Sequence, residues 1–156
     1  MTDQDHGSAG IPRSGRVLGL DWGTSRIGVA ITDATQLIAT PLTTLRRRAG
    51  KRLPLRAFLE IVEKEEPVGL VVGLPFDELG IEGASADAAR TMGDHFADRS
   101  GLPIEWIDES FSTVDAQHAL RDAGRTRAER AADIDAASAA VTLTRWIEMR
   151  RAESHQ

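Results

Sequence analysis

The sequence contains no cysteine. This absence excludes disulfide bonds, thiolate metal sites and thiol nucleophiles together, and it is compatible with a reducing compartment. Any metal ion bound by this chain must therefore be held by oxygen or imidazole ligands.

A long apolar run is also missing. The longest, Val68 to Pro75, is far shorter than the roughly 20 apolar residues that a membrane-spanning helix needs. Residues 1–15 lack the apolar core of a signal peptide. We therefore expect a cytoplasmic protein that does not contact a membrane.

The chain lacks the positive net charge of a protein whose whole surface binds phosphates, because its net charge is −5. Local clusters of cations can still bind nucleic acid. Two such clusters are present, and either one alone is equally well explained as solvated surface. They are Arg46, Arg47, Arg48, Lys51, Arg52 and Arg56, and then Arg121, Arg125, Arg127 and Arg130.

The remaining composition, 41% hydrophobic and 28% charged over 156 residues, is typical of one globular domain. Residues 1–15 are polar and rich in glycine and serine, which predicts a disordered leader. The folded domain is expected over residues 16–150, and residues 151–156 are expected to form a flexible tail.

Five segments have the composition of strands and four have helical spacing of apolar residues. The strands are predicted at 16–21, 26–33, 37–45, 68–74 and 104–108, and the helices at 53–65, 85–99, 113–123 and 134–150. Gly23 is expected to take a positive φ in the first turn, and Pro41 favours a sheet edge. The apolar run 68–74 is expected at the centre of the sheet.

This order predicts an α/β fold with a mixed five-stranded sheet. The first three strands are consecutive and antiparallel, and parallel βα units with right-handed crossovers follow, with helices on both faces. The carboxyl ends of the parallel strands form the edge of the sheet where a site is expected.

Acidic residues stand at this edge. Asp21 ends the first strand before a glycine turn, and Asp108 and Glu109 end the last strand. Asp135 is predicted in the first turn of the last helix, where the small residues 136–140 allow close packing on the sheet. Each acid alone has an ordinary explanation as a turn residue, a solvated loop residue or a partner of the helix dipole.

Together, three carboxylates at one point would repel each other unless divalent cations lay between them. Such hard oxygen ligands suit Mg²⁺ or Mn²⁺. Two ions about 4 Å apart can activate a water molecule and stabilise the leaving oxygen in phosphodiester cleavage. The histidines do not form a competing site, since none has another ligand at metal-binding spacing; they are His6, His95, His118 and His155.

Four segments resemble, in order, the motifs of the YqgF/RuvX family. They are LGLDWGTSRIGVAITD at 18–33, VVGLPFDELGIEG at 71–83, IDESFSTVDA at 107–116 and DIDAASAAVTL at 133–143. The family is described as Holliday junction resolvases and as nucleases that mature the 5′ end of 16S ribosomal RNA. The resemblance spans about residues 16–148 and implies a ribonuclease H-like fold.

The resemblance implies that Asp21, Glu109 and Asp135 form a catalytic, metal-binding triad, with Asp108 as an adjoining metal ligand. The sequence departs from the family pattern at Ser110, where the DER motif has arginine, so Arg26 or Arg125 would supply the positive charge. It departs again at Gly80-Ile81, where the family usually has Gly-Thr.

Further contacts to nucleic acid are expected around the site. Gly80 and Ser85 lie near a helix start, where free N–H groups can bind a phosphate, although an ordinary helix cap explains them too. Arg125, Arg127 and Arg130 are expected in a flexible segment before Asp135, where they would hold the phosphate backbone without reading sequence.

The sequence favours a Mg²⁺- or Mn²⁺-dependent nuclease acting on structured nucleic acid, and the family resemblance alone favours the 5′ end of pre-16S rRNA as the substrate. A Holliday junction resolvase and a non-catalytic binding module are the alternatives. ATP-binding sugar kinases share the DxGT phrase, but they need two lobes and a longer chain. Ribosomal precursor particles are among the expected partners, and a monomer and a homodimer both remain open.

Overall fold

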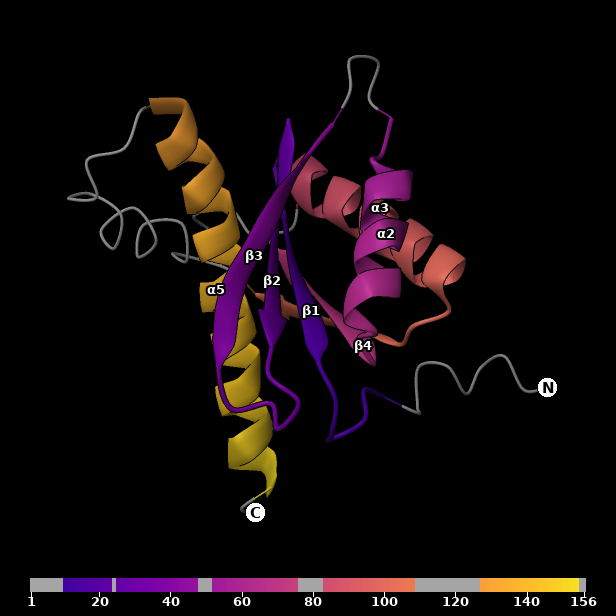
Figure 1. The fold of residues 1–156 in the computed structure, drawn as a ribbon, viewed down its shortest axis with the longest axis vertical. Coiled ribbons are helices and arrows are strands. Elements are labelled where there is room, and N and C mark those ends of the chain that lie inside the picture. Colours follow the sequence, from indigo (N-terminus) through magenta and orange to yellow (C-terminus); the bar gives the residue numbers. More distant parts are fainter. Residues whose placement is uncertain (1–9, 24, 48–51, 76–82, 109–126, 155–156) are drawn as a thin grey trace.

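The computed structural model describes residues 10–23, 25–47, 52–75, 83–108 and 127–154, with side chains except at 108 and 127–133. One five-stranded sheet has the order β3-β2-β1-β4-β5. Helices α2 and α3 cover one face and α5 covers the other (Figure 1). The elements are β1 (Val17–Trp22), β2 (Arg26–Thr32), β3 (Ala39–Arg46), α2 (Leu55–Glu65), β4 (Gly69–Leu74), α3 (Ala84–Ser100), β5 (Ile104–Asp108) and α5 (Arg127–Ser154).

The pairing of strands confirms the predicted mixed sheet. The pairs β1–β2 and β2–β3 are antiparallel, whereas β1–β4 and β4–β5 are parallel. β3 forms an edge, as Pro41 predicted, and the β2–β3 register shifts between Val29 and Ala30. β4 is buried along its whole length but is not central, because β1 holds that position.

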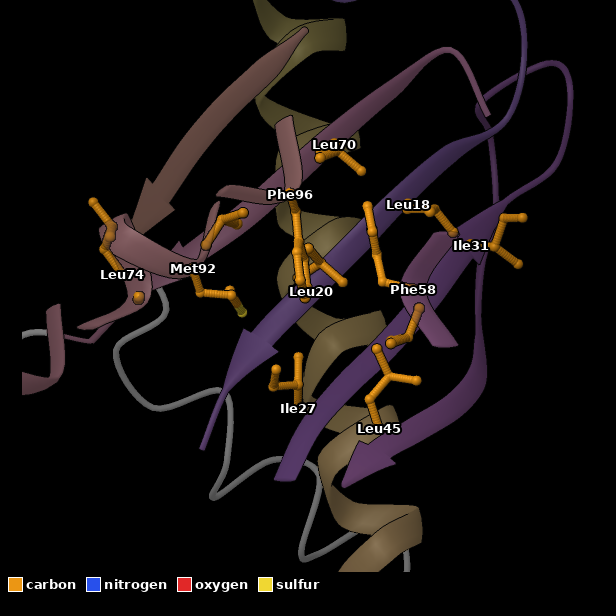
Figure 2. Packing of buried hydrophobic residues seen from close by; sticks show 13 residues of the cluster. Leu18, Leu20, Ile27, Ile31, Leu45, Phe58, Leu70, Leu74, Met92 and Phe96 are labelled. Carbon is orange, nitrogen blue, oxygen red and sulfur yellow. The ribbon is translucent and has the colours of Figure 1, made fainter. Parts of the chain in front are cut away.

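The alternation of side chains along the strands divides the core into two layers. Leu18 and Leu20 pack with α2 and α3, in the layer drawn in Figure 2, whereas Val17 packs with α5. Phe58 of α2 and Phe96 of α3 stack with ring centroids 4.0 Å apart. Odd-numbered residues of β1 therefore face α5, and even-numbered residues face α2 and α3, up to the end of the strand.

Helix α5 is longer than predicted, since it begins at Arg127 and ends at Ser154. Asp135 therefore lies in the helix interior, and its predicted place in the first turn was wrong. Residues 127–132 are alanine, arginine and glutamate, which are strong helix formers but provide no apolar periodicity. Residues 151–154, expected in a flexible tail, are helical, whereas the helix predicted at 113–123 lies outside the described residues.

The predicted leader also ends earlier than expected, because residues 10–15 pack onto the domain. The Ile11 side chain is 3% exposed and belongs to the layer beneath α5. Its backbone N–H donates to Glu105 Oε2 at 3.1 Å. Gln36 Nε2 donates to the carbonyl oxygens of Pro12 and Gly15 at 2.8 and 2.9 Å.

Gly23 does not adopt the positive φ that the sequence suggested. Glycine is needed there for space, because an added Cβ would lie 2.4 Å from the Arg26 carbonyl oxygen. Among the helices of the described ranges, we find none that is both long and apolar enough to cross a bilayer.

Candidate active site

The site begins with Asp21, the fifth residue of β1. Its register partners are Gly28 on β2 and Gly73 on β4. Gly19, two residues earlier, faces α5, since a Cβ there would lie 3.0 Å from Leu143 Cβ. Strand alternation therefore directs the half-buried Asp21 towards α5.

Asp135 reaches the same point from α5. A Cβ added to Gly28 would lie 1.9 Å from the Asp135 carbonyl oxygen, so the helix backbone rests directly on this glycine. Gly28 and Asp21 are directly opposite each other, a relation that places their Cα atoms about 4.5–5.5 Å apart. The structure therefore places the backbone of Asp135 beside the strand pair that carries Asp21.

Arg26 is paired with this acid. Its Nε lies 2.5 Å from Asp135 Oδ2, and the two side chains are 38% and 23% exposed. Arg26 was predicted to bind nucleic acid in place of the missing DER arginine. The structure pairs it with a predicted metal ligand, where its positive charge offsets the negative charge of that carboxylate.

The last strand ends at the same edge. Ile107 is in register with Gly73, the partner of Asp21, and Asp108 is in register with Leu74. Two strand spacings, about 10 Å, separate β5 from β1. The side chain of Asp108 and all of Glu109 lie outside the described residues, so their metal-binding roles remain predictions.

The donor chemistry of the site fits a divalent metal ion. Asp21 and Asp135 supply carboxylate oxygens, the ligands that Mg²⁺ and Mn²⁺ prefer. Within the described ranges, no three acidic or histidine side chains come close enough to hold a metal ion. The third ligand of the predicted triad, Glu109, belongs to the part of the chain beyond those ranges.

The other predicted nucleic-acid contacts are placed in part. Ser85 is exposed in the first turn of α3, which Gly83 caps without a side-chain hydrogen bond. Arg127 and Arg130 lie in α5 and not in the flexible segment that was expected, because the helix begins at Arg127. Gly80 and Arg125 lie outside the described residues.

An aromatic contact beside the acids was not predicted from the sequence. The guanidinium carbon of Arg47 lies 4.3 Å from the ring centroid of Trp22, the residue after Asp21. Trp22 also lines a pocket with Arg52 and Arg99. The run of cations at residues 46–56 was the signal for this contact, but only the fold shows that it meets Trp22.

A family model described as "RuvX: Holliday junction resolvase" matches residues 15–149. The chain belongs to the RuvX family. This membership confirms the resemblance carried by the four motifs. The matched residues include Asp21, Arg26 and Asp135, around which the described part of the site is built.

Curated relatives support the same membership. A protein of Mycobacterium ulcerans is 42% identical over 88% of this chain and 81% of its own. A protein of an Anaeromyxobacter species is 39% identical over 88% of this chain and 99% of its own. Both are named "Putative pre-16S rRNA nuclease". The predicted class for this RuvX member, a phosphodiester hydrolase, agrees with the family description and with these names.

Solved structures confirm the ribonuclease H-like fold. RuvC of T. thermophilus, in complex with a Holliday junction substrate, aligns with a TM-score of 0.56 at 16% identity, over 88% of this chain and 96% of that chain. The yeast mitochondrial Holliday junction resolvase Ydc2 aligns with a TM-score of 0.58 at 12% identity, over 97% and 85%. At these identities the likeness concerns the fold alone.

Proposed function

We propose that the protein is a cytoplasmic, divalent-metal-dependent nuclease that hydrolyses phosphodiester bonds in structured nucleic acid. One observation carries the proposal. In a chain that belongs to the RuvX family, the backbone of Asp135 rests on Gly28, directly opposite Asp21. Two acids separated by more than 100 residues thus share one end of the sheet.

Asp21 and Asp135 would hold the metal ion, with Glu109 as the third ligand and Asp108 beside it. A bound pair of Mg²⁺ or Mn²⁺ ions supplies an activated water molecule and stabilises the leaving oxygen. Asp21 is fixed by its place inside a central strand, and Asp135 by the packing of α5. Both ligands therefore keep their positions without a loop having to order around them.

Arg26 has two partners in this proposal. Its side chain is 38% exposed, so it can also contact a phosphate oxygen of a bound substrate. If Asp135 held a metal ion, the positive charge of Arg26 would be available to a phosphate of the substrate. Arg125, Arg127 and Arg130, together with Gly80 and Ser85, would contact the flanking phosphates.

We propose the 5′ end of pre-16S rRNA as the substrate, within ribosomal precursor particles, on the support of the relatives' names. A DNA four-way junction is the second candidate, because the family model is described as a Holliday junction resolvase. Paired cuts in a junction need two active sites, and a symmetric homodimer would provide them. A monomer would suffice for rRNA.

The test is a cleavage assay that offers both substrates to the purified protein with Mg²⁺, Mn²⁺ or chelator. We expect metal-dependent cleavage, with the rRNA precursor preferred, and its loss in Asp21→Asn. This variant keeps the volume of the side chain but removes the metal-binding charge. Asp94→Asn, an exposed carboxylate on α3, is the matched control and should cleave at the wild-type rate.

An Asp21→Asn protein that keeps most of the wild-type rate would refute the assignment of Asp21. Binding of both substrates without cleavage in either metal would favour the non-catalytic binding module.

A further inference from the structure

A pocket of about 560 Å³ opens on the other face of the sheet, between α3 and the start of α2. The pocket lies at the same end of the sheet as Asp21. Trp22, which follows Asp21, forms part of its wall, and Arg47 follows β3, which runs in the same direction as β1. The volume is within the range of small-molecule sites, roughly 300–1,000 Å³.

The lining combines cations with an apolar wall. The polar part consists of Arg47, Arg52, Thr91, His95 and Arg99, and the apolar part of Trp22, Leu53, Leu55, Ala88 and Met92. No acidic side chain of the described ranges lines it. In contrast, the neighbouring groove along α2 contains Glu60 and Glu63 as well as Arg56. The charge of the pocket therefore selects an anionic ligand that also has an apolar part.

The pocket wall nearest to Asp21 is held in place by contacts between its own residues. Arg47 lies over the Trp22 ring, and its backbone N–H donates to the Ser25 carbonyl oxygen at 3.0 Å. Trp22 is only half-buried, so part of its surface faces the pocket. Asp21 and Trp22 are consecutive residues of one strand and point to opposite faces. The proposed metal site and the pocket therefore include adjacent residues of β1.

We propose that this pocket holds an unpaired nucleotide of the substrate strand, next to the phosphate that is cleaved. The base packs against Trp22, Leu53 and Met92, and the phosphate is bound by the arginines of the rim. Nucleic-acid-binding proteins commonly combine an aromatic surface for bases with cations for the backbone. This inference rests on the proposed function and adds to it the place where a single-stranded segment is recognised.

The first test measures binding of a short, dye-labelled single-stranded RNA by anisotropy, in chelator and over a range of KCl concentrations. Arg99→Ala should weaken binding about two- to fivefold, the factor for an exposed ionic contact, and lower the salt slope by about 0.7. Arg151→Ala removes an equally exposed arginine near the far end of α5 and should change neither quantity.

A second pair of variants separates charge from shape. Thr91 is an exposed position of α3 that lines the pocket. Thr91→Glu places a negative charge there and should weaken RNA binding. Thr91→Gln, whose side chain is nearly the same size as that of glutamate but uncharged, should bind as wild type does. Equal binding by Thr91→Glu, Thr91→Gln and wild type would overturn the proposal.

Fluorescence reports whether a base reaches the wall. RNA should quench tryptophan emission in the wild type, and the quenching should be lost in Trp22→Phe, since Trp106 and Trp146 lie outside this pocket. Unchanged quenching in Trp22→Phe would overturn the proposal. So would adenosine monophosphate binding as tightly as the RNA, because the pocket would then serve a free nucleotide.

These readouts do not depend on catalysis. Asp21→Asn should bind the RNA in chelator at least as tightly as wild type, because it removes a negative charge near the cleaved phosphate and none of the cations of the pocket. Loss of binding in Arg99→Ala together with full cleavage by Asp21→Asn would refute the metal site and leave the pocket intact. Wild-type binding by Arg99→Ala together with an inactive Asp21→Asn would refute the pocket alone.

Discussion

Two glycines decide how closely α5 approaches the sheet. A Cβ at Gly19 would lie 3.0 Å from Leu143 Cβ, and one at Gly28 would lie 1.9 Å from the Asp135 carbonyl oxygen. The sequence predicted the helix side of this contact from its small residues, of which Ala136 and Ala139 are buried. It did not predict the strand side, because which glycine meets the helix depends on the register between β1 and β2.

Gly28→Ala tests this contact at the scale of one residue. The added methyl group cannot be accommodated unless α5 moves away from β2, so we expect a loss of about 1–3 kcal/mol in the free energy of unfolding. Cleavage should fall as well, because Asp135 moves relative to Asp21. Urea denaturation and the cleavage assay measure the two effects.

Wild-type stability and activity of Gly28→Ala would show that α5 does not rest on Gly28.

The ion pair of Arg26 with Asp135 is a second feature that the sequence did not reveal. The family resemblance named Asp135 as a metal ligand and Arg26 as a substitute for a missing arginine, but neither motif shows that the two side chains meet. Their contact depends on β2 passing beneath α5, an arrangement that only the packed fold provides.

At the scale of elements, the β2–β3 connection is held by one carboxylate. The Asp33 carboxylate accepts hydrogen bonds from the Thr35 hydroxyl and from the backbone N–H groups of Ile38, Leu37 and Thr35. These bonds, first of all that of the Thr35 hydroxyl and then that of Ile38, lower the pKa of Asp33 well below its usual value. A pKa that is lower in the folded state than in the unfolded state stabilises the fold at pH values above the unfolded-state pKa, roughly 3.9. This stabilisation is lost as the pH falls below that value.

Asp33→Asn should therefore melt below wild type at pH 7, and the difference should shrink as the pH falls below about 4. Thr35→Ala removes the largest cause of the shift and should give a smaller difference with the same dependence on pH. Thermal melts at a series of pH values measure both. A difference between Asp33→Asn and wild type that stays constant from pH 7 to pH 3 would contradict this role of Asp33.

The described strands and two of the helices could be predicted from the sequence because each has a periodic apolar face or, in β4, a continuous apolar run. The start of α5 could not, since residues 127–133 carry no apolar stripe and an acidic residue before Ile134 resembles a helix cap. The position of β4 was predicted wrongly for a related reason. An apolar run indicates burial on both faces, but any interior strand between two helical layers satisfies that condition.

At the scale of the molecule, residues 10–15 link elements from both ends of the chain. Arg150 of α5 donates to the carbonyl oxygen of Ile11 and, at 3.1 Å, to Gln36 Oε1. The Ile11 side chain packs against Gly69, where a Cβ would lie 2.6 Å from Ile11 Cγ1. The polar composition of residues 1–15 concealed this segment, because a single apolar side chain gives no periodic signal.

Ile11→Ala should cost about 2–5 kcal/mol of the free energy of unfolding, since it removes a fully packed aliphatic side chain. Denaturation in urea measures the loss. Ile38→Ala is the matched control, because Ile38 is 65% exposed. If the two variants were equally stable, residues 10–15 would not belong to the folded domain.

Asp21 and Asp135 are proposed to share one divalent metal site, and the balance of charge there can be measured through the stability of the fold. In such a site without metal, mutual repulsion of the acids would destabilise the fold, although Arg26 would offset part of it. Asp21→Asn is a cleaner probe than Asp135→Asn, which would also deprive Arg26 of its carboxylate.

The most direct measurement is a series of thermal melts of wild type and Asp21→Asn in chelator and with increasing Mg²⁺. At ten times its dissociation constant, one bound ion adds about 1.4 kcal/mol, a rise in Tm of roughly 3–6 °C for a domain of this size. Wild type should show this rise, and Asp21→Asn should melt higher in chelator and gain less from Mg²⁺. If Asp21→Asn instead melts below wild type in chelator and shows the full Mg²⁺ shift, Asp21 does not hold the metal.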